Sequence, residues 1–135
     1  MIFADTGFFV ALAQPRDALH ARAVEWSRSI RESLLLTEMV LWETVHSLSK
    51  PPDRVKAHEI VQEVRSSPGY CLVNVTDELL EARLRLHKDR SDKEWSLTDC
   101  VSLSVMRERG LTRALSHDHH FEQAGYETLL RRDPP

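Results

Sequence analysis

The chain has 135 residues, of which 41% are hydrophobic and 29% are charged, with 4 Gly and 6 Pro. These values are typical of one folded globular domain and exclude disordered and fibrous proteins. Lys and Arg number 18 and Asp and Glu number 21, so the net charge of −3 gives no overall basic field, and any polyanion has to be bound locally.

Five short apolar runs predict strands. They lack the alternation of apolar and polar residues, which is typical of strands buried on both faces of a parallel sheet. The runs are residues 2–4, 34–36, 71–73, 114–115 and 128–130. Between them lie helical patterns at 18–31, 38–49, 54–65, 77–88, 97–109 and 119–124.

This alternation predicts an α/β domain with helices on both faces of a central, mostly parallel sheet of four to five strands. Gly110 and Gly125 stand just beyond two predicted helices, where a left-handed cap is favoured. We assign residues 1–130 to a single domain and residues 131–135 to a short polar tail.

The cysteines and the hydropathy pattern indicate the cellular location. Cys71 and Cys100 form no Cys-x-x-Cys pair, which argues against a thiolate zinc site or a disulfide scaffold. Asp5 follows the first apolar run closely, and no stretch approaches the ~20 apolar residues of a membrane span. We therefore expect a cytoplasmic protein that is neither secreted nor inserted in a membrane.

Two aspartates follow predicted strands. Asp5 comes directly after the first apolar run and Asp118 shortly after the fourth. Both are expected at the carboxyl edge of the sheet, where open α/β sheets bind ligands. The alternative is that each side chain caps the following helix, a task that Ser116 could also perform beside Asp118.

Two further acids lie in predicted helices. Ser96 and Asp99 have the spacing of a capping box, and the helix that follows is apolar on most sides. A carboxylate at the start of such a buried helix needs a partner, and a cation is one. Glu43 occupies a narrow polar gap in a helix whose circumference is otherwise expected to be buried; solvent or a binding site would explain the gap.

The four acids together favour a metal site. Converging carboxylates repel one another unless a divalent cation holds them, and hard oxygen ligands suit Mg²⁺ or Mn²⁺. Magnesium bound by a few carboxylates keeps several waters, which leaves room for a phosphate oxygen and an attacking water. The reaction that this arrangement indicates is hydrolysis of a phosphodiester.

At these positions the chain resembles the PIN-domain nucleases, in particular the VapC-like toxin ribonucleases of type II toxin–antitoxin systems. The resemblance covers nearly the whole chain and is carried by Asp5-Thr6 after the first strand, by the helix with Glu43, and by the segments 95–100 and 116–126. It implies a three-layer α/β/α PIN-like domain with endoribonuclease activity that depends on Mg²⁺ or Mn²⁺.

The resemblance also implies residue roles and partners. Asp5 and Asp99 would be the principal metal ligands, Asp118 a further ligand directly or through water, and Glu43 the acid that orients a metal-bound water. Thr6 would support Asp5. The partners implied are an RNA substrate, a second copy of the chain in a homodimer, and a small antitoxin that lays an apolar helix across a groove and directs an Arg or Lys toward the acids.

The roles of several residues near these motifs stay open. Asp92 and Glu94 fit a solvated loop better than a site. His117, His119 and His120 could ligate zinc or another transition metal, but they also fit the exposed start of a helix, and we keep only His119, as a candidate phosphate contact.

Contacts to RNA could come from the basic segment Arg83 to Lys93, although charge runs are usually solvated faces. Trp26, Trp42 and Trp95 could stack on bases, but burial is the expectation for Trp42 in particular.

Two other functions are compatible with part of the pattern. A Mg²⁺-dependent phosphoryl-transfer domain, such as a receiver or a haloacid-dehalogenase-like phosphatase, also uses an Asp at a strand end. The phosphatase, however, needs a second acid two positions later, where this chain has Gly7. The other alternative is a catalytically degenerate PIN-like module that binds RNA or protein and uses the acids only as helix caps.

Overall fold

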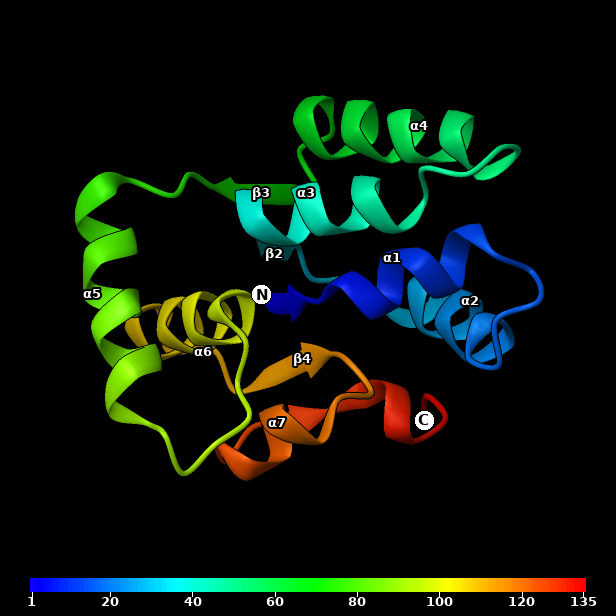
Figure 1. Ribbon diagram of the computed structural model, residues 1–135. Helices are drawn as coiled ribbons and strands as arrows, with labels where there is room; N and C mark the ends of the chain where they lie inside the picture. Colours follow the sequence, from blue (N-terminus) through cyan, green and yellow to red (C-terminus); the bar gives the residue numbers. More distant parts are fainter.

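Five strands form one parallel sheet in the computed structural model, which describes all residues from 1 to 135 (Figure 1). Their order in the sheet is β3-β2-β1-β4-β5. The strands are β1 (Ile2–Ala4), β2 (Leu34–Thr37), β3 (Tyr70–Val73), β4 (Arg113–Leu115) and β5 (Glu127–Thr128). Every neighbouring pair is parallel.

Seven α-helices and one 3₁₀ turn connect and flank these strands. They are α1 (Thr6–Ala13), α2 (His20–Ser29), α3 (Glu38–Ser47), α4 (Asp53–Ser66), α5 (Asp77–Asp89), α6 (Leu97–Arg109), α7 (His119–Gln123) and η1 (Leu129–Arg131). The expected alternation of strands and helices, and the parallel sheet, are confirmed. None of the helices combines the length and the apolar composition that crossing a membrane requires.

The core lies around the central strand β1. In the sheet register Phe3 stands beside Leu35 of β2 and Ala114 of β4, and all three residues are fully buried. A strand with neighbours on both sides and helices on both faces has no solvent side, which explains why its apolar run shows no alternation.

The helix that the sequence analysis did not predict is α1. Phe8, Phe9 and Ala11 are buried in this segment, which contains almost no polar side chains. Helical periodicity is recognised by the contrast between an apolar and a polar face, and here that contrast is missing. The left-handed conformations expected at Gly110 and Gly125 are present, with φ angles of 66° and 91°.

The C-terminal end of the chain differs in part from the prediction. The last strand ends at Thr128, and residues 129–131 form η1 instead of continuing the strand. The expected polar tail contacts α2: the indole N–H of Trp26 donates to the carbonyl of Arg132 at 2.8 Å, and Arg22 pairs with Asp133 at 2.9 Å. The polar end of the chain is therefore attached to the domain.

The order of the strands determines where a site can form. The chain leaves β1 toward β2 on one side, and returns through α6 to β4 on the other side. The carboxyl ends of β1 and β4 are thus adjacent at the point where the strand order reverses, which is the usual ligand position in open α/β sheets. The backbone N–H of Asp5 donates to the carbonyl of Leu115 at 3.2 Å across this junction.

Candidate active site

Asp5 lies at the carboxyl end of β1, immediately before α1. Its side chain accepts no hydrogen bond from the backbone N–H of the second or third residue of α1, so helix capping does not explain it. Instead, its Oδ2 accepts a hydrogen bond from the Ser116 hydroxyl at 2.9 Å. Burial raises the pKa of Asp5 from 3.8 to about 7; the hydrogen bonds from Ser116 and from the Thr6 backbone oppose this shift, and the charges of Asp99 and Asp118 add to it.

Asp99 is the third residue of α6. The predicted capping box is present, with the Ser96 hydroxyl accepting from the Asp99 N–H and Asp99 Oδ2 accepting from the Ser96 N–H, both at 3.0 Å. The following stretch from Cys100 to Met106 is buried throughout, as expected. The same Oδ2 lies 3.0 Å from His120 Nδ1, so this carboxylate both caps its helix and faces the site.

Asp118 precedes α7 and caps it, because its Oδ1 accepts the backbone N–H of His120 at 2.9 Å. Its own backbone N–H donates to the Ser116 hydroxyl at 3.0 Å. Ser116 is fully buried and therefore links two of the acids: it donates to the Asp5 carboxylate and accepts from the Asp118 backbone. The sequence analysis considered Ser116 only as an alternative cap.

His120 is a site residue that the sequence analysis did not select. Its Nδ1 lies 3.0 Å from Asp99 Oδ2 and 3.2 Å from Asp118 Oδ1, and its side chain is 13% exposed. Asp118, His119 and His120 also bring ligand atoms within 4.8 Å of one another, although His119 is exposed. His117 points to solvent, and only its carbonyl is engaged, by Arg131.

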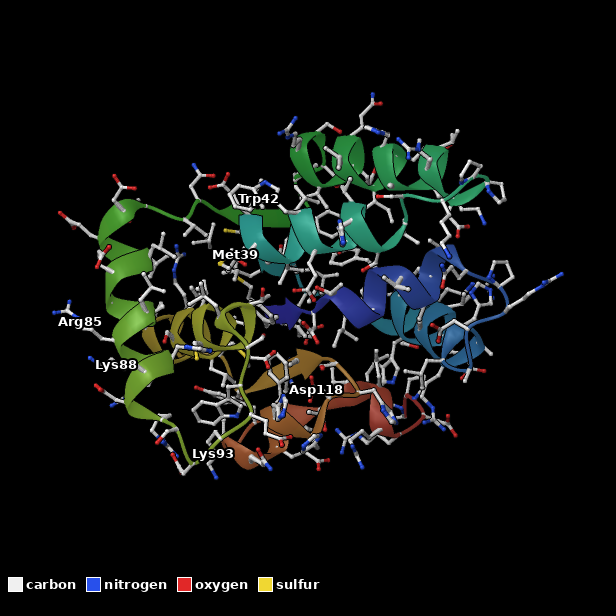
Figure 2. All side chains as sticks on the ribbon, viewed as in Figure 1. Met39, Trp42, Arg85, Lys88, Lys93 and Asp118 are labelled. Atoms are coloured by element: carbon white, nitrogen blue, oxygen red, sulfur yellow. The ribbon has the colours of Figure 1, made fainter.

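Glu43 lies in α3, and its side chain is exposed and makes no ion pair or hydrogen bond with the three aspartates. The expectation that most of this helix is buried was wrong: Trp42 is 58% exposed, whereas Val40, Leu41 and Thr44 form the buried face. Helix α3 packs against α1, α4 and α6, and Trp42 and Glu43 are exposed. Figure 2 shows Trp42 on this helix.

The other two tryptophans are buried. Trp26 and Trp95 are 5% and 9% exposed, so the tryptophan with the largest exposed surface is the one expected to be buried. The apolar neighbours of Trp42 in sequence suggested a buried environment, but a short helix that packs on one side leaves consecutive residues in different environments.

The basic residues between Arg83 and Lys93 lie in different environments. Arg83 is paired with Glu108, and Arg90 is paired with Asp92 at 3.0 Å. Arg85 and Lys88 project from the outer side of α5, away from Asp118, whereas Lys93 lies on the loop between α5 and α6 (Figure 2). Asp92 is exposed in its ion pair, and Glu94 is exposed in the same loop.

The residues of this site fit a hard divalent cation. Carboxylates from separate parts of the chain lie near one another, and the half-buried Asp5 has its pKa raised by desolvation and, to a smaller extent, by the charges of Asp99 and Asp118. Next to it, the buried hydroxyl of Thr6 has no hydrogen-bond partner. A cation bound at the carboxylates would supply the missing charge.

Comparison with known proteins identifies the family. The model of the PIN domain family matches residues 2–126. The chain belongs to the PIN domain family. This membership confirms the predicted family and the α/β/α fold, and it favours a nuclease over a phosphoryl-transfer domain.

Two relatives of this PIN-domain protein are informative. The 23S rRNA-specific endonuclease VapC20 of Mycobacterium tuberculosis is 30% identical over 126 residues, which are 93% of this chain and 95% of the relative. The crystal structure of VapC20, described as a sarcin–ricin loop cleaving toxin, superposes with a TM-score of 0.84 at 28% identity over 93% of this chain and 96% of that one.

A more distant match is FitAcB from Neisseria gonorrhoeae, with a TM-score of 0.66 at 19% identity over 95% of this chain and 96% of that one. At this identity the likeness supports the fold alone.

The raised pKa of Asp5 predicts a pH dependence of stability in metal-free protein. The folded state has a pKa of about 7 and the unfolded chain one near 3.8, so between these values the folded protein holds a proton that the unfolded chain releases. The free energy of unfolding therefore decreases as the pH rises from about 4 to about 7, by up to about 4 kcal/mol. Urea denaturation in EDTA measures this change, and Asp5→Asn should flatten it. If the wild-type protein and Asp5→Asn showed the same pH dependence of the free energy of unfolding, Asp5 would not be the group responsible for it.

Proposed function

We propose that this PIN-domain protein is a Mg²⁺- or Mn²⁺-dependent endoribonuclease that hydrolyses RNA phosphodiester bonds in the cytoplasm, as the toxin of a toxin–antitoxin pair. The observation that carries this proposal is the approach of Asp5, Asp99 and Asp118 to one another at the junction of β1 and β4, where no cationic side chain pairs with Asp5. Because VapC20 is named for 23S rRNA and the sarcin–ricin loop, that loop is the first substrate to test.

We assign Asp5 and Asp99 as the principal ligands of the cation and Asp118 as a further ligand, directly or through water. The cation, when bound, lowers the pKa of water and neutralises charge that develops on the phosphate. Ser116 holds the Asp5 carboxylate in place, and Asp99 and Asp118 hold the His120 ring between them. These contacts restrict the ligands to one arrangement before substrate binds.

For Glu43 we propose the role of orienting the attacking water and accepting its proton. Its helix α3 contacts both α1 and α6, at whose first turns Asp5 and Asp99 stand. The exposed carboxylate is accessible to water, as this role requires.

Substitution of the principal ligands tests the proposal. We expect Asp5→Asn and Asp99→Asn each to abolish cleavage of sarcin–ricin loop RNA in Mg²⁺ or Mn²⁺, because an amide lacks the charge that binds the cation. Gel electrophoresis of end-labelled RNA measures cleavage, and circular dichroism checks the fold. Glu59→Gln, an equally conservative change of an exposed carboxylate on α4, is the control and should cleave like wild type. Retained cleavage in the aspartate variants defeats the assignment.

A catalytically degenerate module, the alternative left by the sequence, is distinguished by metal binding. A cation that binds only the folded protein stabilises it by mass action. We expect Mg²⁺ or Mn²⁺ to raise the melting temperature of the wild-type protein, and to raise that of Asp99→Asn much less, in calorimetric scans without RNA. A melting temperature that does not change with the cation concentration would favour the degenerate module.

We also propose a surface for the antitoxin. A groove of about 510 Å³ between α1 and α4 is lined mainly by apolar side chains, among them Phe9, Leu12, Ile60 and Tyr70. Phe9 lies about one helical turn from Asp5, so a helix in this groove with an Arg or Lys at one end reaches the acids. The homodimer implied by the family resemblance stays a prediction.

Co-purification tests the antitoxin surface. We expect a small basic protein encoded beside this chain to co-purify with the wild-type protein and with Val55→Glu, but not with Ile60→Glu. Both substitutions add one charge to α4, but Ile60 lines the groove and Val55 is 66% exposed outside it. Failure of the wild-type protein to retain any small basic partner in mass spectrometry would count against the toxin role.

A further inference from the structure

A second pocket lies beside the acidic site, and neither the sequence motifs nor the proposed metal chemistry accounts for it. It has a volume of about 310 Å³ and lies between α5, the loop before α6, α6 and the end of α7. We propose that this pocket binds a nucleotide of the RNA adjacent to the scissile phosphate. The proposal rests on the proposed nuclease function and assigns a substrate-binding site to it.

The charge of the lining points to a polyanion. Arg90, Lys93 and Arg107 line the pocket, and no Asp or Glu is among its lining residues. The side chains of Lys93 and Arg107 make no ion pair within the chain, so both are free to contact a phosphate. In a protein with a net charge of −3, a concave site whose lining has two unpaired cations and no carboxylate is the kind of local field that RNA binding needs.

A hollow of about 270 Å³ lies between the pocket and the acidic site. Lys93 and Gln123 line both the hollow and the pocket, and the other residues that line the hollow are Asp92, Glu94, His119 and His120. His120 in turn contacts Asp99 and Asp118. An RNA strand whose scissile phosphate is at the carboxylates would reach the cationic pocket past this hollow, where Asp92 is already paired with Arg90. Figure 2 shows Asp118 and Lys93 on this side of the molecule.

The walls of the pocket suit a base as well as a phosphate. Leu86, Leu103 and Trp95 supply apolar surface. The Arg90 guanidinium lies 4.9 Å from the Trp95 ring centroid and is held there by Asp92, so it offers a fixed flat cation on which a base can stack. A volume of this size is at the lower end for small-ligand sites, which fits one nucleotide.

A matched pair of double variants tests the proposal. Lys93→Ala with Arg107→Ala removes two charges from the pocket, whereas Arg85→Ala with Lys88→Ala removes two charges from the outer side of α5. The probe is a fluorescein-labelled pool of 20-nucleotide single-stranded RNAs of random sequence, and its binding is measured by fluorescence anisotropy in EDTA, so that no cleavage takes place.

We expect the pocket variant to bind the RNA pool about tenfold more weakly than the wild-type protein, and the slope of log K against log salt to become smaller by about 1.4, the value for two phosphate contacts with a single strand. The outer variant should stay within about twofold of wild type. Equal losses in the two variants, or no loss in either, would overturn the proposal. So would a poly-glutamate peptide that binds as tightly as RNA and depends on the same two residues, since the pocket would then serve an acidic protein.

Measuring RNA cleavage and RNA binding separately distinguishes a failure of this inference from a failure of the proposed function. Cleavage of sarcin–ricin loop RNA by the wild-type protein in Mn²⁺, together with equal binding of the RNA pool by both double variants, would leave the nuclease in place and remove the nucleotide pocket. Absence of both binding and cleavage in the wild-type protein would remove both. Thermal melting of each variant verifies that the fold is intact.

Discussion

The half-buried carboxylate of Asp5 accepts a hydrogen bond from the Ser116 hydroxyl and has the charges of Asp99 and Asp118 nearby. Such an arrangement is unfavourable for an ionised group and raises the pKa of Asp5. The rest of the structure maintains it: the order of the strands brings the ends of β1 and β4 together, and the buried helix α6 presents Asp99 to them. A cation is the simplest way to make this geometry favourable.

The sequence predicted those parts of the site that are connected to a strand end or a helix start. Asp5, Asp99 and Asp118 each follow a local pattern, because an acid after an apolar run, or three residues after a capping serine, has few possible positions. The buried strands were predictable for a similar reason, since a run such as Leu34 to Leu36 has no polar side to expose.

What the sequence could not predict depends on contacts between distant elements. His120 joins the site because α7 places its ring next to Asp99, a residue 21 positions away in the chain. Ser116 becomes a link between two acids only when β1 and β4 lie side by side. The exposure of Trp42 depends on which face of α3 meets other helices, and the burial of Trp95 depends on how the loop before α6 packs; periodicity within one helix does not contain that information. Glu43 was selected from its place in a polar gap of its helix. That gap is on the exposed part of α3, which periodicity alone could not establish.

The attachment of the chain end to α2 has a consequence for how the protein is handled. The backbone N–H of Leu130 donates to the carbonyl of Ser116 at 3.1 Å, two residues before Trp26 anchors the carbonyl of Arg132. The 3₁₀ turn η1 thus stabilises the position of Ser116, the residue whose hydroxyl donates to Asp5. A truncation before Arg132 removes the contact with Trp26 and therefore weakens a support of the acidic centre although every acid is still present. An affinity tag at the N-terminus does not affect these contacts. Because β1 begins at Ile2, directly after Met1, such a tag needs a spacer.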